Sequence, residues 1–210
     1  QMCIRDSDEG DKEEPKPDED ENVTGTLAFE DIWPSGGDYD MNDVIVEYER
    51  KVYFDKKNIV TKIVDEFTPV HDGATYVNAF AYQIDAAQIG DKITLPEGAI
   101  LEKETSSIIV MSNAKQNIGN KYVVTREFNG SFLKNQLLSY NPYIIVKYSQ
   151  GEQNRTEVHL PKHKATAYAN QSLIGSNDDA YYIDRKGAYP FAIDIPMLGF
   201  TPVTERNLSL

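Results

Sequence analysis

The sequence contains very little cysteine, few clustered basic residues and no long apolar run. Cys3 is the only cysteine in 210 residues, so an intramolecular disulfide framework and a cysteine-based metal site are both excluded. No stretch approaches the roughly 18 consecutive apolar residues of a membrane-spanning helix. The 21 lysines and arginines are scattered among 34 aspartates and glutamates, giving a net charge of −13. Nucleic-acid binding is therefore not expected, because phosphates would be repelled.

Recognisable catalytic motifs are also missing. The sequence has no Gly-x-Ser-x-Gly nucleophile elbow, no His-Glu-x-x-His zinc motif and no glycine-rich phosphate loop. A carboxylate pair for glycoside hydrolysis needs only proximity in space, so a glycoside hydrolase stays open as an alternative. We predict a protein that is not an enzyme.

The negative charge is concentrated near the N-terminus. Residues 8–21 hold nine acidic residues, two lysines and no apolar side chain, and they carry −7 of the net charge. Such a segment buries too little surface to offset its chain entropy. We predict a disordered acidic tail over residues 1–21 and one folded domain over residues 22–210. Residues 1–7 resemble the stub found at the ends of genes predicted from assembled environmental DNA, and we treat them as non-native.

Short segments of alternating apolar residues dominate the rest of the chain. Residues 44–54 and 58–67 predict two strands joined by a turn at 55–58, and residues 76–84 place Tyr76, Phe80, Tyr82 and Ile84 on one strand face. Further strands are predicted at 92–95, 107–112, 121–128, 143–149, 155–160 and 189–195. This pattern predicts an all-β fold, an antiparallel β-sandwich with few short helices, of which a jelly roll is one form. Helical segments are expected only at 132–140, where an irregular crossover is the alternative, and at 202–208.

Acidic residues crowd into the loop before the first of these strands. Asp38, Asp40 and Asn42 stand at alternate positions, Asp43 follows, and Glu30 and Asp31 lie just upstream. Carboxylates this close repel one another unless a cation lies among them, and calcium takes six to eight oxygen ligands. We predict a structural calcium site with ligands drawn from Glu30, Asp31, Asp38, Asp40, Asn42 and Asp43.

The same loop has other interpretations. Asp and Asn side chains often hydrogen-bond their own backbone, so one alternative is that these acids cap turns and bind no ion. Asp43 is predicted to be either a ligand or a hydrogen-bonding brace for loop amides. The spacing also resembles the start of a helix–loop–helix calcium loop, with Glu49 at its twelfth position, but a helix pair is not predicted. Zinc is not favoured, because the segment has no histidine or cysteine. Gly36 and Gly37 are expected to let the backbone fold around the ion.

Two weaker groups of residues lie elsewhere. His159 and His163 are four residues apart, but Pro161 between them disfavours a helical zinc site, and we predict a polar pair of Glu157 with His159 and an exposed His163. Tyrosine, with 13 residues, outnumbers phenylalanine, with 8. An aromatic platform for a sugar ring is the alternative to a core position for the tryptophan; its candidates are Trp33, Tyr39, Tyr181 and Tyr182.

Five segments together resemble the LruC-type domain of bacterial envelope proteins and lipoproteins. In chain order they are residues 28–34 (AFEDIWP), 37–44 (GDYDMNDV), 78–82 (NAFAY), 157–161 (EVHLP) and 190–196 (PFAIDIP). The resemblance runs from about residue 26 to the C-terminus. It implies an all-β domain, and relatives that continue beyond the position of Glu205 into a helical tail, so the domain is expected to be truncated after Leu210.

These observations combine into one functional hypothesis. We expect a non-catalytic calcium-binding β-sandwich module of a bacterial cell-surface or secreted protein, with adhesion or ligand binding as its role and a carbohydrate-binding module as the alternative. The expected partner is a surface glycan or protein. The expected location is the cell envelope, as an outer-membrane-anchored lipoprotein, or the extracellular space. Membrane association is expected only through a lipid anchor.

Overall fold

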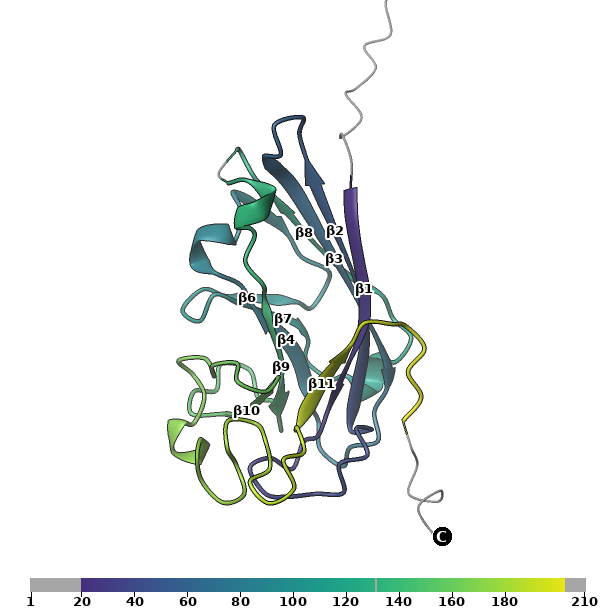
Figure 1. Ribbon diagram of the computed structural model, residues 1–210, viewed down its shortest axis with the longest axis vertical. Helices are drawn as coiled ribbons and strands as arrows, with labels where there is room; N and C mark the ends of the chain where they lie inside the picture. The colour runs from purple at the N-terminus through teal and green to yellow at the C-terminus, as the bar shows by residue number, and fades with distance from the viewer. Residues whose placement is uncertain (1–19, 131, 203–210) are drawn as a thin grey trace, which may run out of the picture.

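Two antiparallel β-sheets pack face to face in the computed structural model of this chain, which describes residues 20–130 and 132–202 (Figure 1). The predicted antiparallel β-sandwich is therefore confirmed. Most of the predicted N-terminal tail lies outside the described residues. The first strand starts at Asp20, two residues before the predicted start of the domain, because Asp20 and Glu21 pair with Tyr53 and Val52.

The first sheet, called the long sheet below, has six strands in the order β11-β1-β2-β3-β8-β5. Its members are β1 (Asp20–Phe29), β2 (Val44–Phe54), β3 (Val60–His71), β5 (Lys92–Thr94), β8 (Tyr122–Glu127) and β11 (Ala192–Ile195). The second, or short sheet, has five strands in the order β10-β9-β4-β7-β6. Its members are β4 (Ala79–Gln83), β6 (Ile100–Glu102), β7 (Ser107–Met111), β9 (Asn141–Val146) and β10 (Thr156–His159).

Strand alternation in the sequence located most of these elements. The strand predicted at 44–54 is β2, and Asn58 forms the predicted turn to β3 in a left-handed conformation (φ 60°). Strand β1 and the three-residue strand β6 were not predicted. Residues 132–140 form a crossover with a single 3₁₀ turn at Lys134–Gln136 in place of a longer helix. The remaining 3₁₀ turns are Ala86–Gln88, Lys115–Asn117 and Gln171–Leu173.

The main hydrophobic core lies between the two sheets. Phe29, Phe67 and Val46 from the long sheet meet Phe80 and Tyr82 from the short sheet, and all of them are buried. The rings of Phe67 and Phe80 are 5.1 Å apart in a tilted contact. The predicted inward face of the β4 segment is thus confirmed for Phe80, Tyr82 and Ile84, whereas Tyr76 precedes the strand and is exposed. Within the described ranges, no helix is long and apolar enough to cross a membrane.

A layer of buried charge interrupts this core. The carboxylate of Asp65 on β3 lies 3.1 Å from Nη2 of Arg126 and 3.4 Å from Nε of Arg50, and it accepts a hydrogen bond from the hydroxyl of Tyr82. The side chains of Asp65 and Arg126 are fully buried. One carboxylate therefore compensates two guanidinium groups, and the layer depends on it.

We predict that Asp65→Ala lowers the free energy of unfolding by about 3–5 kcal/mol, because it removes the carboxylate that pairs with the fully buried Arg126 and the partly buried Arg50. For a domain of this size the melting temperature should fall by roughly 10 °C. The matched control is Glu66→Ala, since the neighbouring side chain points to the opposite face and pairs with the exposed Lys121. That variant should lose less than about 1 kcal/mol. Equal effects of the two substitutions in thermal unfolding would contradict the assignment.

Candidate metal site in the acidic loop

The acidic loop, residues 30–43, closes the hairpin between β1 and β2 at one end of the sandwich (Figure 1). Phe29 pairs with Val44 in the ladder, so the two ends of the loop lie side by side. The backbone N–H of Glu30 donates to the carbonyl oxygen of Phe191 at 2.9 Å. Acids from the start of the loop are therefore brought next to acids from its end.

Three of the predicted ligands converge in this loop. Glu30, Asp38 and Asp40 each offer a carboxylate oxygen, and these oxygens all lie within 4.8 Å of one another. Glu30 is buried, Asp40 half-buried and Asp38 exposed. The side-chain amide of Asn42 donates to Asp40, so the fourth predicted ligand also lies beside this group. Hard oxygen donors in this arrangement match the coordination preferences of calcium.

The ionisation of Glu30 reports on the electrostatics of the loop. Burial, together with the charges of Asp43, Asp38 and Asp40, raises the pKa of Glu30 to about 8. A hydrogen bond from the backbone N–H of Met41 to Oε1 of Glu30, at 2.5 Å, opposes this rise without cancelling it. A bound cation would remove the repulsion and favour the ionised carboxylate.

The other two predicted ligands act as braces. Asp43 Oδ2 accepts the backbone N–H of Asp31 at 2.8 Å, and Asp31 Oδ2 accepts the side-chain amide of Asn78 at 2.8 Å. Burial raises the pKa of Asp43 to about 6; the hydrogen bond from the Asp31 backbone opposes this rise, and the charge of the Asp31 side chain adds to it. Of the two roles predicted for Asp43, the structure shows the hydrogen-bonding one. The six predicted residues thus separate into a converging group and a bracing pair.

The conformation of the loop differs from the expectation for its glycines. The left-handed positions are Tyr39 and Met41, each with φ 56°, and not Gly36 or Gly37. At Gly37, a Cβ atom would lie 2.2 Å from Cδ1 of Ile32, so this exposed side chain would have to move. The glycine therefore permits close packing inside the loop, and the reversal of the backbone falls on the residues beside Asp38 and Asp40.

Trp33 anchors the loop in the core. It is 4% exposed, its indole N–H donates to Oδ1 of Asp179 at 2.8 Å, and its ring lies 4.7 Å from that of Tyr182. The prediction of a core position for Trp33 is confirmed. The alternative prediction, a sugar-binding platform of aromatic side chains, is wrong, because two of its four candidates, Trp33 and Tyr182, are buried.

Asp72 is a residue that sequence reasoning missed. Its side chain is fully buried beside the loop, Lys115 Nζ lies 3.9 Å from Oδ1, and neither oxygen receives a hydrogen bond of normal geometry within the described part of the chain. Burial raises the pKa of Asp72 to about 6; Lys115 opposes the rise and Asp31 adds to it. The following Gly73 donates its backbone N–H to the carbonyl of Asn42. In the sequence, Asp72 and Gly73 are indistinguishable from an ordinary turn.

The predicted polar pair of Glu157 and His159 is confirmed. His159 Nε2 lies 2.9 Å from Glu157 Oε2, and its Nδ1 lies 2.8 Å from Asn141 Oδ1. Both residues are buried, and Arg155 Nε donates to Glu157 at 2.7 Å. Since both ring nitrogens of His159 are engaged in hydrogen bonds, the alternative of a zinc site with His163 loses its support. His163 itself is partly exposed.

Glu49 does not belong to the acidic loop. It lies within β2 and its carboxylate accepts a hydrogen bond from the side-chain amide of Asn22 at 2.8 Å. The structure therefore agrees with the prediction that the loop is not part of a helix–loop–helix calcium site.

The fold and the loop together define an antiparallel β-sandwich domain with an acidic loop at one end. The chain belongs to the family described as "Domain of unknown function (DUF4842)", whose model matches residues 102–207, about half of the sequence. The acidic loop precedes the matched range, whereas Asp179 and Phe191, which hold the loop in place, fall inside it.

The chain is also similar to a solved structure. This is the crystal structure of a "Putative lipoprotein from Bacteroides ovatus", with a TM-score of 0.61 and 17% sequence identity. The similarity covers 85% of this chain and 66% of that protein, so the chain spans just under two thirds of its length. At this identity the similarity shows a shared fold. No curated protein matches the chain.

We predict that, with excess chelator present, the free energy of unfolding of Glu30→Gln rises relative to that of the wild type as the pH increases. Folded Glu30 keeps its proton up to a pKa of about 8, against an ordinary value of 4.5, so the folded state binds more protons than the unfolded chain between these values. The free energy of unfolding of the wild type therefore falls as the pH rises through this window. Glutamine does not titrate and keeps an acceptor for Met41. The gap should widen by roughly 4 kcal/mol from about pH 5 to about pH 9, since one pKa unit corresponds to about 1.4 kcal/mol.

Thermal unfolding with excess chelator at both pH values measures this gap. Glu104→Gln, at an exposed position outside the loop, is the control for the change in net charge. A gap for Glu30→Gln that does not change with pH would show that Glu30 is not under electrostatic stress in the folded protein.

Proposed function

We propose that this chain is a non-catalytic, calcium-stabilised β-sandwich module of a bacterial cell-surface or secreted protein, with a role in adhesion or ligand binding. The observation that carries the proposal is the convergence of Glu30, Asp38 and Asp40 within 4.8 Å, on a carboxyl group whose pKa is raised to about 8. Carboxylates this close together in a short loop repel one another, and a cation bound among them would relieve the repulsion.

Calcium is favoured as the cation because of the donor set. Carboxylates from Glu30, Asp38 and Asp40, with Asn42 beside them, are all oxygen-bearing side chains. Calcium accepts six to eight such ligands in flexible geometry, whereas magnesium demands a near-ideal octahedron and retains several waters. The ion would have a structural role, because the loop joins two adjacent strands of the long sheet.

The bacterial envelope is the location we propose, as an outer-membrane lipoprotein or an extracellular protein. The Bacteroides ovatus protein of similar fold is named as a lipoprotein. The LruC-type resemblance points in the same direction. An acidic segment ahead of the folded domain has the composition of a flexible spacer from an anchor. A glycan or a protein on the cell surface is the proposed partner.

The test is a double substitution in the loop. Calcium at 100 times its dissociation constant should add about 2.7 kcal/mol to the free energy of unfolding of the wild type. This corresponds to a rise in melting temperature of roughly 5–10 °C over the chelated protein. Asp38→Ala with Asp40→Ala should abolish the rise, because two of the converging oxygen donors are removed.

The matched control is Glu97→Ala with Glu104→Ala, which removes two exposed acids outside the loop and makes the same change in net charge. This control should respond to calcium as the wild type does. If the loop variant also responds as the wild type does, the ion binds elsewhere and the assignment is wrong. Equal responses to magnesium and calcium would contradict the choice of ion.

A further inference from the structure

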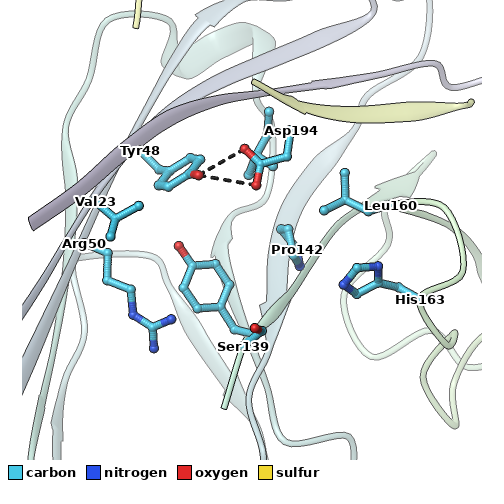
Figure 2. A pocket seen from close by; sticks show the side chains of 10 residues that line it. Val23, Tyr48, Arg50, Ser139, Pro142, Leu160, His163 and Asp194 are labelled. Carbon is cyan, nitrogen blue, oxygen red and sulfur yellow. Dashed lines mark hydrogen bonds between the residues drawn. The ribbon is translucent and has the colours of Figure 1, made fainter. Parts of the chain in front are cut away.

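A cleft of about 340 Å³ lies between the two sheets, away from the acidic loop. Figure 2 shows Arg50 and His163 on opposite sides of it, with Tyr48 and Asp194 along a third side. The long sheet supplies residues from β1, β2 and β11, and the short sheet supplies residues at the start of β9 and just after β10. The lining residues with polar groups are Tyr48, Arg50, Ser139, Tyr140, His163 and Asp194.

The unequal lengths of the strands explain why the sheets part at this place. Strands β1 and β2 have 10 and 11 residues, whereas β9 and β10 have six and four. The inner face of the long sheet therefore extends beyond the strands that would cover it. Val23 at this end of β1 is 48% exposed, as expected for an inward-facing side chain without a covering strand.

A glycine positions the first aromatic wall of the cleft. Gly25 pairs with Tyr48 across β1 and β2, and a Cβ atom on Gly25 would lie only 2.5 Å from the Tyr48 hydroxyl oxygen. The phenol ring can therefore lie across β1. Its hydroxyl reaches Asp194, 3.0 Å from Oδ1 and 3.3 Å from Oδ2. Tyr48 thus fixes a carboxylate at the edge of the cleft, where this exposed group can accept further hydrogen bonds.

Arg50 supplies donors on another side. Its guanidinium carbon lies 4.4 Å from the centre of the Tyr140 ring, a cation–π contact. Its Nε is buried and lies 3.4 Å from Oδ1 of Asp65, a partner shared with the fully buried Arg126. The terminal amino groups of Arg50 are therefore the donors that it can offer to the cleft, which it lines.

The combination of groups narrows the class of ligand. The carboxylate of Asp194 would repel a phosphate or other polyanion. The guanidinium group of Arg50 would repel a metal ion or an organic cation. A lipid tail would leave the polar groups without partners. A neutral sugar has hydroxyl groups that both donate and accept, and apolar ring faces that pack on aromatic and aliphatic side chains such as Tyr48, Pro142 and Leu160. The volume falls at the lower end of the usual range for small-ligand sites.

We propose that this cleft binds a neutral saccharide, with Asp194 accepting from sugar hydroxyl groups, Arg50 donating to them, and Tyr48 and Tyr140 forming the aromatic walls. The proposal rests on the proposed role in ligand binding but not on calcium, because no residue of the acidic loop lines the cleft. Tyr48 acts partly as a positioning residue, through its hydrogen bond to Asp194.

The test is a nuclear magnetic resonance titration of the isotope-labelled chain, saturated with calcium, with maltose, cellobiose, lactose and N,N′-diacetylchitobiose at millimolar concentrations. At least one disaccharide should cause saturable shifts that map to Gly25, Tyr48, Ser139 and their neighbours. Asp194→Ala should weaken the apparent affinity by about tenfold or more, the loss expected for about 1.4 kcal/mol of hydrogen bonding. This residue is exposed, so the melting temperature should change little.

A bulky substitution gives an independent readout. Ser139→Trp places a large ring at the exposed rim and should abolish the shifts. Ser149→Trp is the matched control: the serine is also exposed and lies beyond the opposite end of β9, so binding should be unchanged. Melting temperatures in calcium check that both variants fold.

Three results would overturn the proposal. The first is the absence of shifts with all four disaccharides in well-folded protein. The second is shifts that persist in Ser139→Trp or that map to the acidic loop. The third is binding of inorganic phosphate or an acidic peptide in place of the sugars, which would make the cleft an anion site. Each of these can occur while the response of the protein to calcium is intact, so failure here is distinguishable from failure of the calcium proposal.

Discussion

The burial of Glu30 among other carboxylates in the acidic loop is the constraint that governs this end of the sandwich. Burial raises the pKa of Glu30 to about 8, and the charges of Asp43, Asp38 and Asp40 add to the rise. The backbone offers one hydrogen bond to Glu30, which is too little to offset the burial and the neighbouring charges. A cation bound among these oxygens would favour the ionised carboxylate. Under the proposed calcium binding, the ion would therefore stabilise this end of the sandwich.

The loop connects parts of the chain that are distant in sequence, so the effect of an ion would extend beyond it. Trp33 bonds to Asp179, and the backbone N–H of Gly36 donates to Asp178 at 3.2 Å. On another side, Gly73 bonds to the carbonyl of Asn42. The loop therefore holds together the start of β2, the end of β3 and the segment before β11. An ion that stabilises the loop would stabilise these contacts with it.

Local sequence pattern was enough for most of the fold and for the convergence of half of the predicted ligands. Alternation identified β2 along its whole length, and the crowding of acids in the sequence predicted the proximity of Asp38, Asp40 and Glu30. Hydrogen bonds between residues that are distant in the sequence could not be predicted from local pattern. The bracing role of Asp31 depends on Asn78, and the burial of Asp72 depends on the path of β3. The cleft was also missed, because Arg50 stands at an inward position that strand alternation alone assigns to an apolar residue.

Calcium anomalous diffraction from crystals of this protein grown with calcium tests the central claim most directly. We predict one strong anomalous peak between the carboxylates of Glu30, Asp38 and Asp40. It should lie about 2.3–2.6 Å from their oxygens, the distance typical of calcium–oxygen coordination. The peak should be absent from crystals of the variant with Asp38→Ala and Asp40→Ala. An empty loop in calcium-soaked wild-type crystals, or a peak at another place only, would contradict the account.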